Sequence, residues 1–206
     1  MTPWNFPLTV PPGDFAGFIF DCDGTLIDSM PLHWHAWRVA LQEQQAPFDF
    51  TEEMHHAFAG QSIPETVAVC NARYGCQIDP ARVEIARTEY FFSHLDELRV
   101  VEPVVDFARA QFGRLPLAVA SGSDRNIVVR ELTHLGLIDL FPVIVTADDV
   151  ARSKPAPDLF LLAAQQLGVP PSACLVFEDG HNGLRAAEAA GRPWVYVPTN
   201  EPRDAA

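Results

Sequence analysis

The sequence predicts an α/β fold, a doubly wound, Rossmann-like parallel sheet into which a small α-helical domain is inserted. Three observations predict this fold class. Short apolar runs of strand length recur along the chain, and beyond residue 101 they alternate with helix-type stretches. Polar residues directly follow several of the runs, as they do where parallel strands end at a binding edge. The stretch 30–100 lacks such runs and has helical spacing instead.

The composition is that of a globular protein. The chain has 206 residues, of which 48% are hydrophobic, and this is enough for a core and a second, smaller domain. A net charge of −13 argues against a nucleic-acid-binding surface and against attraction to anionic lipid. No apolar run approaches the length of a membrane span. We therefore expect neither nucleic acid nor membrane as a partner.

The N-terminal segment and the cysteines predict a cytoplasmic protein. Residues 1–14 contain four prolines, no lysine or arginine and no long apolar region, unlike a secretory signal. The cysteines show no Cys-x-x-Cys spacing, which favours a reducing compartment, with a Cys70–Cys76 disulfide as the alternative. We expect a monomer, with a homo-oligomer as the alternative.

The first predicted strand and the turn after it organise the chain. The apolar run 16–20 has the length of a buried strand, and two carboxylates, Asp21 and Asp23, follow it. The Gly-Thr pair that comes next allows a tight turn behind these acids. A lone Asp-x-Asp pair fits a solvated acidic turn equally well, so its interpretation depends on polar residues elsewhere in the chain.

The stretch between the first and second strands is predicted to be a helical cap domain. It is rich in Trp, His, Gln and Glu, and its large apolar residues follow helical spacing. It is too long for a simple crossover connection. We therefore divide the chain into a core, residues 1–29 and 101–206, and a cap, residues 30–100. Helices packed on the main sheet are the alternative.

After the cap, strands and helices alternate in the manner of βα units joined by right-handed crossovers. Apolar runs predict the strands, while helical spacing bounded by capping residues and glycines predicts the helices. The predicted strands are 117–120, 143–145, 174–177 and 194–197; the predicted helices begin at Ser123 or Asp124, near Pro157 and at Gly183, and end at Gly136, Gly168 and Gly191. Residues beyond about Pro198 are predicted to form a frayed tail.

Four polar motifs follow predicted strands or precede a predicted helix. They are Asp21-Cys22-Asp23-Gly24-Thr25, Ser121-Gly122-Ser123, Ser153-Lys154-Pro155 and Glu178-Asp179-Gly180. As an ordered set they resemble the motifs of the haloacid dehalogenase superfamily, whose members are mostly phosphatases. The resemblance covers residues 18–197 and extends to the β-phosphoglucomutase-like and fructose-1-phosphate phosphatase groups, which carry a helical cap after the first motif.

Two of these motifs have simpler interpretations when each is considered alone. Lys154 would then be a surface lysine in a turn, and the Glu178–Asp179 pair would be two solvated acids at a helix start. Their occurrence in the order of the family favours the functional interpretation.

The resemblance implies covalent phosphoryl-transfer chemistry. Asp21 would be the nucleophile that becomes an aspartyl phosphate, and Asp23 would protonate the leaving alcohol and then activate water. Lys154 would steady the nucleophile and the phosphoryl group with a fixed positive charge. The phosphate oxygens would be bound by Ser121 and by backbone amides at Cys22, Gly122 and Ser123.

The cofactor that the resemblance implies is Mg²⁺. The Asp21 carboxylate, the Asp23 main-chain carbonyl and Asp179 would hold the ion, which prefers oxygen ligands. Glu178 would orient these ligands or bind a metal-bound water. Relatives often have serine after the Glu-Asp pair, where this chain has Gly180, and this difference would alter hydrogen bonding without removing a ligand.

The second aspartate of the first motif favours phosphoryl transfer over dehalogenation, because attack on carbon needs no acid for a leaving alcohol. Transfer of the β-phosphoglucomutase type is the alternative. Ungapped spacing puts Ile63 and Asp124 where the mutases carry cations for a second phosphate. Water is therefore the expected acceptor. An inactive relative that serves as a binding module is the alternative from another functional class.

The similarity to the fructose-1-phosphate phosphatases implies a small phosphorylated metabolite as substrate, a sugar phosphate such as fructose 1-phosphate or 6-phosphogluconate. The candidates for sugar contact in the cap are His33, Trp37, Gln61 and Ser62. For His33, a packed hinge histidine is the alternative. The cap is expected to close through hinges near residues 29–30 and 99–101 and thereby exclude water.

Overall fold

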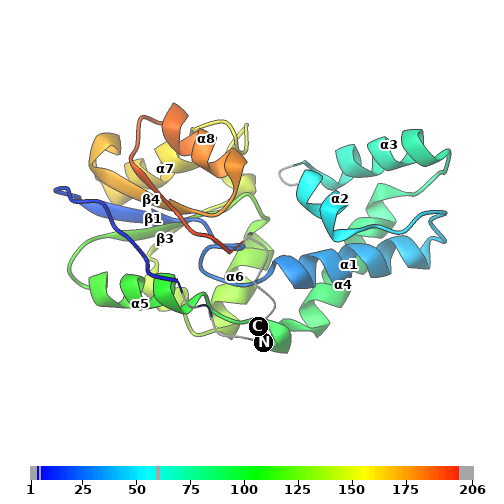
Figure 1. Ribbon diagram of the computed structural model, residues 1–206, viewed down its shortest axis with the longest axis horizontal. Coiled ribbons are helices and arrows are strands. Elements are labelled where there is room, and N and C mark those ends of the chain that lie inside the picture. Colours follow the sequence, from blue (N-terminus) through cyan, green and yellow to red (C-terminus); the bar gives the residue numbers. More distant parts are fainter. Residues whose placement is uncertain (1–3, 5, 59–60, 200–206) are drawn as a thin grey trace. The chain divides into compact units, whose positions relative to one another are not determined.

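The computed structural model describes residues 4, 6–58 and 61–199. Its contacts divide the chain into two compact units, whose elements are labelled in Figure 1. The core unit comprises Met1–Asp28 and Arg99–Ala206, and the inserted unit comprises Ser29–Leu98. Each unit buries a hydrophobic cluster of its own, as separate domains do.

A five-stranded sheet forms the centre of the core unit. The strands are β1 (Gly17–Phe20), β2 (Leu117–Ala120), β3 (Val143–Val145), β4 (Cys174–Glu178) and β5 (Trp194–Tyr196). All neighbouring strands pair in parallel, in the order β3-β2-β1-β4-β5. The chain therefore reverses its direction of winding beside β1, and the predicted doubly wound sheet is confirmed.

The register of the sheet aligns the carboxyl ends of its three central strands. Phe20 of β1 lies opposite Val119 of β2 and Phe177 of β4. The Asp21 amide donates a hydrogen bond to the Phe177 carbonyl (3.0 Å), which extends the pairing by one residue. The residues that follow these three strands consequently meet at one edge of the sheet.

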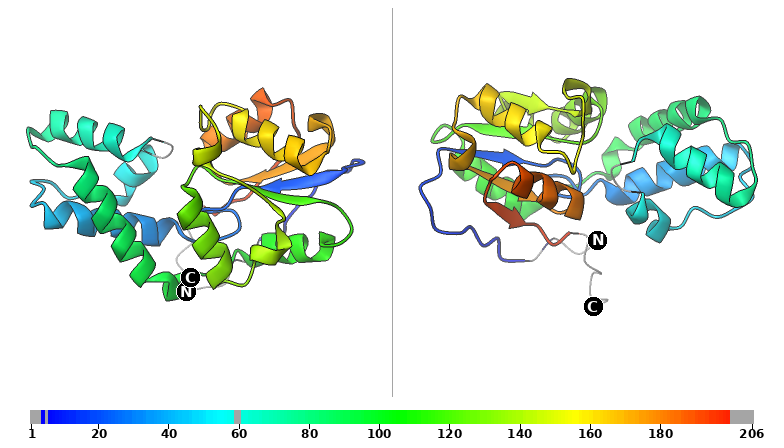
Figure 2. Two further views of the ribbon diagram at one scale, coloured as in Figure 1. Left: turned by 180° about the vertical axis from the view of Figure 1, so that it is seen from behind. Right: turned by 90° about the horizontal axis from the view of Figure 1, so that it is seen from above.

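Helices cover both faces of the sheet (Figures 1 and 2). Helices α7 (Asp158–Leu167) and α8 (His181–Ala189) contact each other on one face. Helices α5 (Glu102–Gln111) and α6 (Arg125–His134) lie on the other face. Short 3₁₀ turns complete the unit: η2 (Ile138–Leu140), η3 (Ala147–Asp149) and η4 (Pro171–Ala173).

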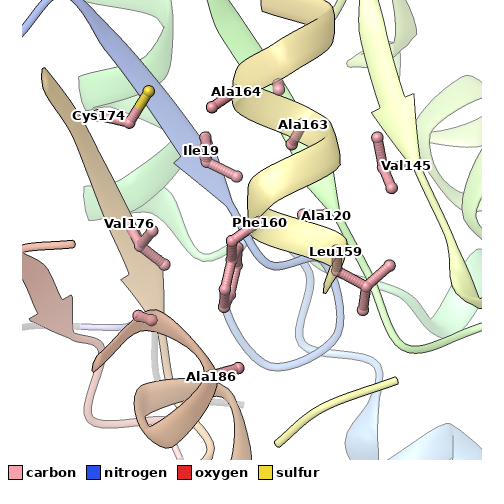
Figure 3. Packing of buried hydrophobic residues seen from close by; sticks show 12 residues of the cluster. Ile19, Ala120, Val145, Leu159, Phe160, Ala163, Ala164, Cys174, Val176 and Ala186 are labelled. Atoms are coloured by element: carbon pink, nitrogen blue, oxygen red, sulfur yellow. The ribbon is translucent and has the colours of Figure 1, made fainter. Parts of the chain in front are cut away.

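Successive residues of β1 face opposite layers of the core unit, as strand geometry requires. Ile19 belongs to the cluster beneath α7, where Leu159 and Phe160 cover the sheet (Figure 3). The Phe18 ring contacts the Phe107 ring of α5 on the other face, with centroids 5.0 Å apart. Both faces of β1 are therefore buried in apolar surroundings, which fixes the position of the polar residues after it.

In the described part of the inserted unit, the regular elements are all helices. Its elements are α1 (Met30–Glu43), α2 (Glu52–Ala57), α3 (Ile63–Tyr74), α4 (Pro80–Ser93) and the 3₁₀ turn η1 (Leu95–Glu97). Helix α4 packs against α1 and α3. Trp37, Phe50 and Val83 are among the apolar residues that form its core.

The local predictions differ from the structure at two helix starts, those of α7 and α8. In addition, the sequence analysis did not assign the bounds of a helix to the segment that forms α5. Pro157 is the N-cap of α7 instead of lying in its first turn, and α8 begins at His181, two residues before the predicted start. Asp124 is the N-cap of α6, but the Asp148 carboxylate accepts the hydrogen bond from the first helical amide. Helix starts depend on such tertiary contacts, and sequence patterns therefore place them only approximately.

Two further findings concern the thiols and the helix lengths. All four cysteines carry free thiols, and the alternative Cys70–Cys76 disulfide does not form. Among the helices in the described part of the chain, none has the length and apolar character needed to cross a bilayer.

Candidate active site

Several polar side chains converge at the carboxyl edge of the core unit's sheet. Asp21 follows β1, Ser121 follows β2, and Asp179 follows β4. The exposed fraction of each is 6% or less. Lys154 reaches them from the loop between β3 and α7. Each side chain is positioned by a buried strand or by the connection that follows one, and together they form one buried polar cluster at this edge.

Lys154 links two of these segments. Its ammonium donates hydrogen bonds to the Asp21 carboxylate and to the Glu178 carboxylate, the latter at 2.8 Å. The Lys154 side chain is only 10% exposed. The interpretation of Lys154 as a surface lysine is therefore wrong, and so is that of Glu178 and Asp179 as solvated acids, because both are buried.

Negative charge exceeds positive charge in this buried cluster. Asp21, Glu178 and Asp179 have carboxylate oxygens within 4.8 Å of one another. Burial raises the pKa of Asp21 well above its usual value, and the Glu178 charge raises it further. The same two causes raise the pKa of Asp179 to about 7. Burial would lower the pKa of Lys154, but the charges of Asp21 and Glu178 raise it instead.

The donor set of this cluster fits a divalent cation. Three ionised carboxylates beside one lysine leave two excess negative charges, which a doubly charged ion would balance. The available donors are carboxylate oxygens, which Mg²⁺ prefers over nitrogen and sulfur. A cation there would also remove the repulsion that raises the pKa values of Asp21 and Asp179.

The turn after β1 approaches Asp179 closely. Gly24 has a φ of 83°, and a Cβ at this position would overlap the Asp179 carboxylate. The Thr25 hydroxyl donates a hydrogen bond to the Asp179 carboxylate at 2.8 Å.

The segment after β5 also contacts this turn. The Thr199 hydroxyl donates a hydrogen bond to the Gly24 carbonyl. The prediction of a frayed tail beginning after Pro198 is thus wrong for Thr199, while residues 200–206 lie outside the described part.

Asp23 is held by the segment that follows β2. Its carboxylate accepts a hydrogen bond from the Ser123 hydroxyl at 2.6 Å, and the Ser121 hydroxyl lies 3.5 Å from the same oxygen. The Ser123 amide in turn donates to the Ser121 hydroxyl at 3.0 Å. These contacts bring the first and second motifs together. The contacts that the sequence did not predict include the hydroxyl of Thr25 on Asp179 and the buried Glu131 beside Cys22.

A sequence model of the haloacid dehalogenase-like hydrolases matches residues 15–191. The chain belongs to the haloacid dehalogenase-like hydrolase family. It is 39% identical over 183 residues to the fructose-1-phosphate phosphatase YqaB of Escherichia coli, a match that covers 89% of this chain and 96% of that protein. It is 30% identical over 182 residues to a phosphorylated carbohydrates phosphatase of Thermotoga maritima, covering 86% and 82% of the two chains.

Solved structures of the haloacid dehalogenase-like family agree with this assignment. The crystal structure of CbbY from Rhodobacter sphaeroides in complex with phosphate matches with a TM-score of 0.77 at 27% identity, covering 93% of this chain and 92% of that one. The predicted family resemblance and fold class are confirmed. The predicted enzyme class, a haloacid dehalogenase-type phosphatase, is confirmed as well.

Gly183 makes room for Glu178 in this haloacid dehalogenase-like site. It lies in the first turns of α8, and a Cβ there would overlap the Glu178 carboxylate that contacts Lys154. In an ordinary helix, replacing glycine by alanine stabilises the protein by about 1 kcal/mol. Here we expect Gly183→Ala to lower the stability by about 1–3 kcal/mol through overpacking, and to lower kcat because Glu178 and Lys154 are displaced.

Urea unfolding and steady-state kinetics test this expectation for Gly183. Glu188→Ala, an exposed substitution in the same helix, is the matched control and should leave kcat unchanged. A fully active Gly183→Ala variant that is more stable than the wild type would show that Glu178 does not need this space.

The sequence candidates in the inserted unit occupy different environments. Trp37 is buried, and its ring stacks on Phe50 with centroids 5.3 Å apart. Trp37 thus packs in the core of that unit, and its assignment as a sugar contact stays a prediction. The His33 ring stacks on Phe91 at 4.4 Å, consistent with the packed alternative.

The two polar candidates of the inserted unit lie at the start of α3. Gln61 is exposed. Ser62 is the N-cap and forms a capping box with Glu65, whose carboxylate accepts hydrogen bonds from the Ser62 amide (2.9 Å) and hydroxyl (2.7 Å). The Ser62 side chain therefore caps the start of α3, and both Ser62 and Gln61 stay predicted substrate contacts.

Proposed function

We propose that this chain is a Mg²⁺-dependent phosphatase that hydrolyses small phosphorylated metabolites, in particular sugar phosphates, through an aspartyl-phosphate intermediate. Fructose 1-phosphate and 6-phosphogluconate are the substrates we favour. The observation that carries the proposal is the convergence of Asp21, Lys154 and Asp179 at one sheet edge. The names of the relatives from Escherichia coli and Thermotoga maritima support a phosphorylated sugar as the substrate class.

In the first step, one Asp21 oxygen attacks phosphorus and forms an aspartyl phosphate. The bond between phosphorus and the leaving oxygen breaks, and Asp23 donates its proton to that oxygen, so that a neutral alcohol departs. Lys154 keeps its positive charge beside Asp21 throughout. A bound Mg²⁺, held by the Asp21 carboxylate, the Asp23 carbonyl and Asp179, with Glu178 beside them, would neutralise charge on the phosphoryl oxygens.

In the second step, water attacks the phosphorus of the aspartyl phosphate. Asp23, which lost its proton in the first step, now accepts one from the water. The phosphorus–Asp21 bond breaks, inorganic phosphate is released, and both aspartates return to their starting states. The position of Asp23 two residues after the nucleophile allows one group to serve in both steps.

Phosphate binding is assigned to the two turns nearest Asp21. The Ser121 hydroxyl and the backbone amides at Cys22, Gly122 and Ser123 would donate hydrogen bonds to the phosphoryl oxygens. Such donors act strongly because they are fixed in place before the substrate arrives. The Cys22 thiol is fully buried, and burial raises its pKa well above the usual value, so it is not a second nucleophile.

The inserted unit is proposed to act as a cap over the sugar. It would close through the segments near 29–30 and 99–101 and exclude water from the first step, in which an alcohol must leave. The two polar candidates at the start of α3 are proposed to contact the substrate. Hydrolysis is favoured over a mutase reaction because Ile63 and Asp124 provide no cation for a second phosphate.

A substrate panel tests this function. The protein is incubated with p-nitrophenyl phosphate, fructose 1-phosphate, 6-phosphogluconate and β-glucose 1-phosphate, with Mg²⁺ or with EDTA, and free phosphate is measured. We expect phosphate release from at least one sugar phosphate, only with Mg²⁺. Conversion of β-glucose 1-phosphate to glucose 6-phosphate without free phosphate would indicate the mutase instead. No turnover of any substrate would contradict the proposal.

A further inference from the structure

A short segment after β5 crosses the carboxyl edge of the core unit's sheet. Strand β4 lies between β5 and β1, so a segment from β5 must pass the end of β4 to reach the turn after β1. The Val197 amide donates a hydrogen bond to the Glu178 carbonyl at 2.9 Å, and the Thr199 hydroxyl donates one to the Gly24 carbonyl. We call residues 197–199 the edge strap, because they join the end of β4 to the turn after β1.

The edge strap is itself fixed in place. Val197 has no exposed surface, and Thr199 is half-buried. The Thr199 amide donates a hydrogen bond to the Val197 carbonyl at 2.9 Å, which folds the strap into a tight turn. The hydroxyl of Thr199 is therefore presented to the turn after β1 by a backbone that is already held.

The two carbonyls that the strap binds adjoin the groups to which we assign Mg²⁺. Glu178 directly precedes Asp179, and Gly24 directly follows Asp23. The Asp179 carboxylate and the Asp23 main-chain carbonyl are two of the three proposed ligands. A strap that is bound at both places can fix the distance between these two ligands.

Gly24 is the residue of this turn that most needs an external contact. Its φ of 83° lies in the left-handed region, and it has no side chain to restrict the rotation of its peptide units. Because a peptide unit is planar, the Asp23 carbonyl moves together with the Gly24 amide. That amide donates a hydrogen bond to the Ile27 carbonyl at 2.7 Å, which holds the first of the two peptide units.

The second peptide unit joins Gly24 to Thr25. Its amide lies 3.3 Å from the Cys22 carbonyl, which is longer than a typical hydrogen bond of this kind. Its carbonyl accepts the hydrogen bond from Thr199. Rotation of this unit would displace the Thr25 hydroxyl, which donates to the Asp179 carboxylate at 2.8 Å. The contact from the strap therefore restrains a peptide unit on which the position of Asp179 depends.

We propose that Thr199 is a positioning residue of the Mg²⁺ site, which fixes the Asp23 carbonyl and the Asp179 carboxylate through the backbone of Gly24. This inference rests on the proposed function, because it concerns the same metal site. Groups that orient metal ligands typically change metal affinity about 10-fold to 100-fold when they are removed. The decisive measurement is therefore the affinity for Mg²⁺ in the absence of substrate.

The experiment compares Thr199→Val, Thr199→Ser and the control Thr133→Val with the wild type. Valine keeps the shape of threonine and removes its hydroxyl, whereas serine keeps the hydroxyl. Thr133 is an exposed threonine of α6, so its replacement tests the effect of the same substitution away from the strap. Mg²⁺ is titrated by calorimetry, Tm is measured in EDTA and in Mg²⁺, and phosphate release from fructose 1-phosphate is measured over a range of Mg²⁺ concentrations.

We expect the Kd of Thr199→Val for Mg²⁺ to be about 10-fold above that of the wild type. Thr199→Ser should stay within about 3-fold of the wild type, because the hydroxyl is retained, and Thr133→Val should match it. The Mg²⁺ concentration for half-maximal activity of Thr199→Val should rise by the same factor of about 10, while kcat at saturating Mg²⁺ stays within about 3-fold of the wild type.

The Tm measurements separate positioning from packing. In EDTA, we expect the Tm of Thr199→Val to lie within about 3 °C of the wild type, because the side chain keeps its shape. At one fixed Mg²⁺ concentration the ion should raise the Tm of this variant less than that of the wild type, since stabilisation by a ligand follows its affinity. A lower Tm in EDTA, with a loss of kcat that neither saturating Mg²⁺ nor serine restores, would overturn the proposal in favour of a structural role.

Unchanged Mg²⁺ affinity in Thr199→Val would also overturn the proposal, and it would leave the phosphatase function intact. A wild type that binds Mg²⁺ but hydrolyses no sugar phosphate would contradict the proposed function alone, because the calorimetric comparison still decides the role of Thr199. A wild type that binds no Mg²⁺ would overturn both.

Discussion

We expect Asp21→Asn to give a folded protein whose kcat for sugar phosphates is at least about 10⁴-fold below that of the wild type, the scale typical of removing a covalent nucleophile. An amide oxygen is a poor nucleophile, and no other described carboxylate has the same place at the tip of β1 beside Lys154. The loss should extend to p-nitrophenyl phosphate, because Asp21 attacks phosphorus whichever leaving group the substrate carries.

The Asp21→Asn variant should remain folded for a physical reason. Asp21 is buried, and both burial and the Glu178 charge disfavour its ionised form. A neutral amide of the same shape removes this unfavourable charge, while Lys154 keeps its hydrogen bond to Glu178. We expect a Tm within about 5 °C of the wild type. A folded variant that retains more than about one per cent of wild-type turnover would exclude Asp21 as the nucleophile.

Removal of the divalent cation is expected to abolish phosphate release, and added Mg²⁺ should restore it. The physical reason is the excess of buried negative charge in Asp21, Glu178 and Asp179, to which a substrate phosphate would add more. In Asp179→Ala, the Mg²⁺ concentration for half-maximal activity should rise by about 100-fold or more, because a ligand is lost.

Calorimetric titration of Mg²⁺ in the absence of substrate checks this expectation independently of activity. Thr25→Val should have a smaller effect, because it keeps Asp179 and removes only the hydroxyl that donates a hydrogen bond to it at 2.8 Å. We expect this variant to bind Mg²⁺ about 10-fold more weakly than the wild type. Unchanged Mg²⁺ affinity in Asp179→Ala would remove Asp179 from the ligand set and would contradict the metal assignment.

Most of the core unit could be predicted because its pattern is local. The apolar runs of β1, β2 and β4 are short, fully buried and followed at once by polar residues, so both the strands and their common edge follow from composition and spacing. Helix α5 was not delimited, although its buried face contains Val104, Val105 and Ala108.

Side-chain environments were harder to predict because they arise from distant segments. Trp37 was predicted as a sugar contact from its residue type and position, and that pattern did not indicate that it packs on Phe50 in the core of the inserted unit. Residue type alone does not distinguish an exposed aromatic platform from a core residue. Thr199 lies 175 residues from the Gly24 carbonyl that it binds, so no local pattern indicated its role.

The sequence by itself determined the parallel sheet, the order of its motifs and the identity of the acids and the lysine at its edge, because strand period and turn chemistry are local properties of the chain. Only the tertiary structure decided which of these charges are buried together and which additional group, Thr199, binds the turn that follows β1. The reason is that burial and the resulting pKa values depend on what distant segments bring into contact, and this information is absent from the spacing of residues along the chain.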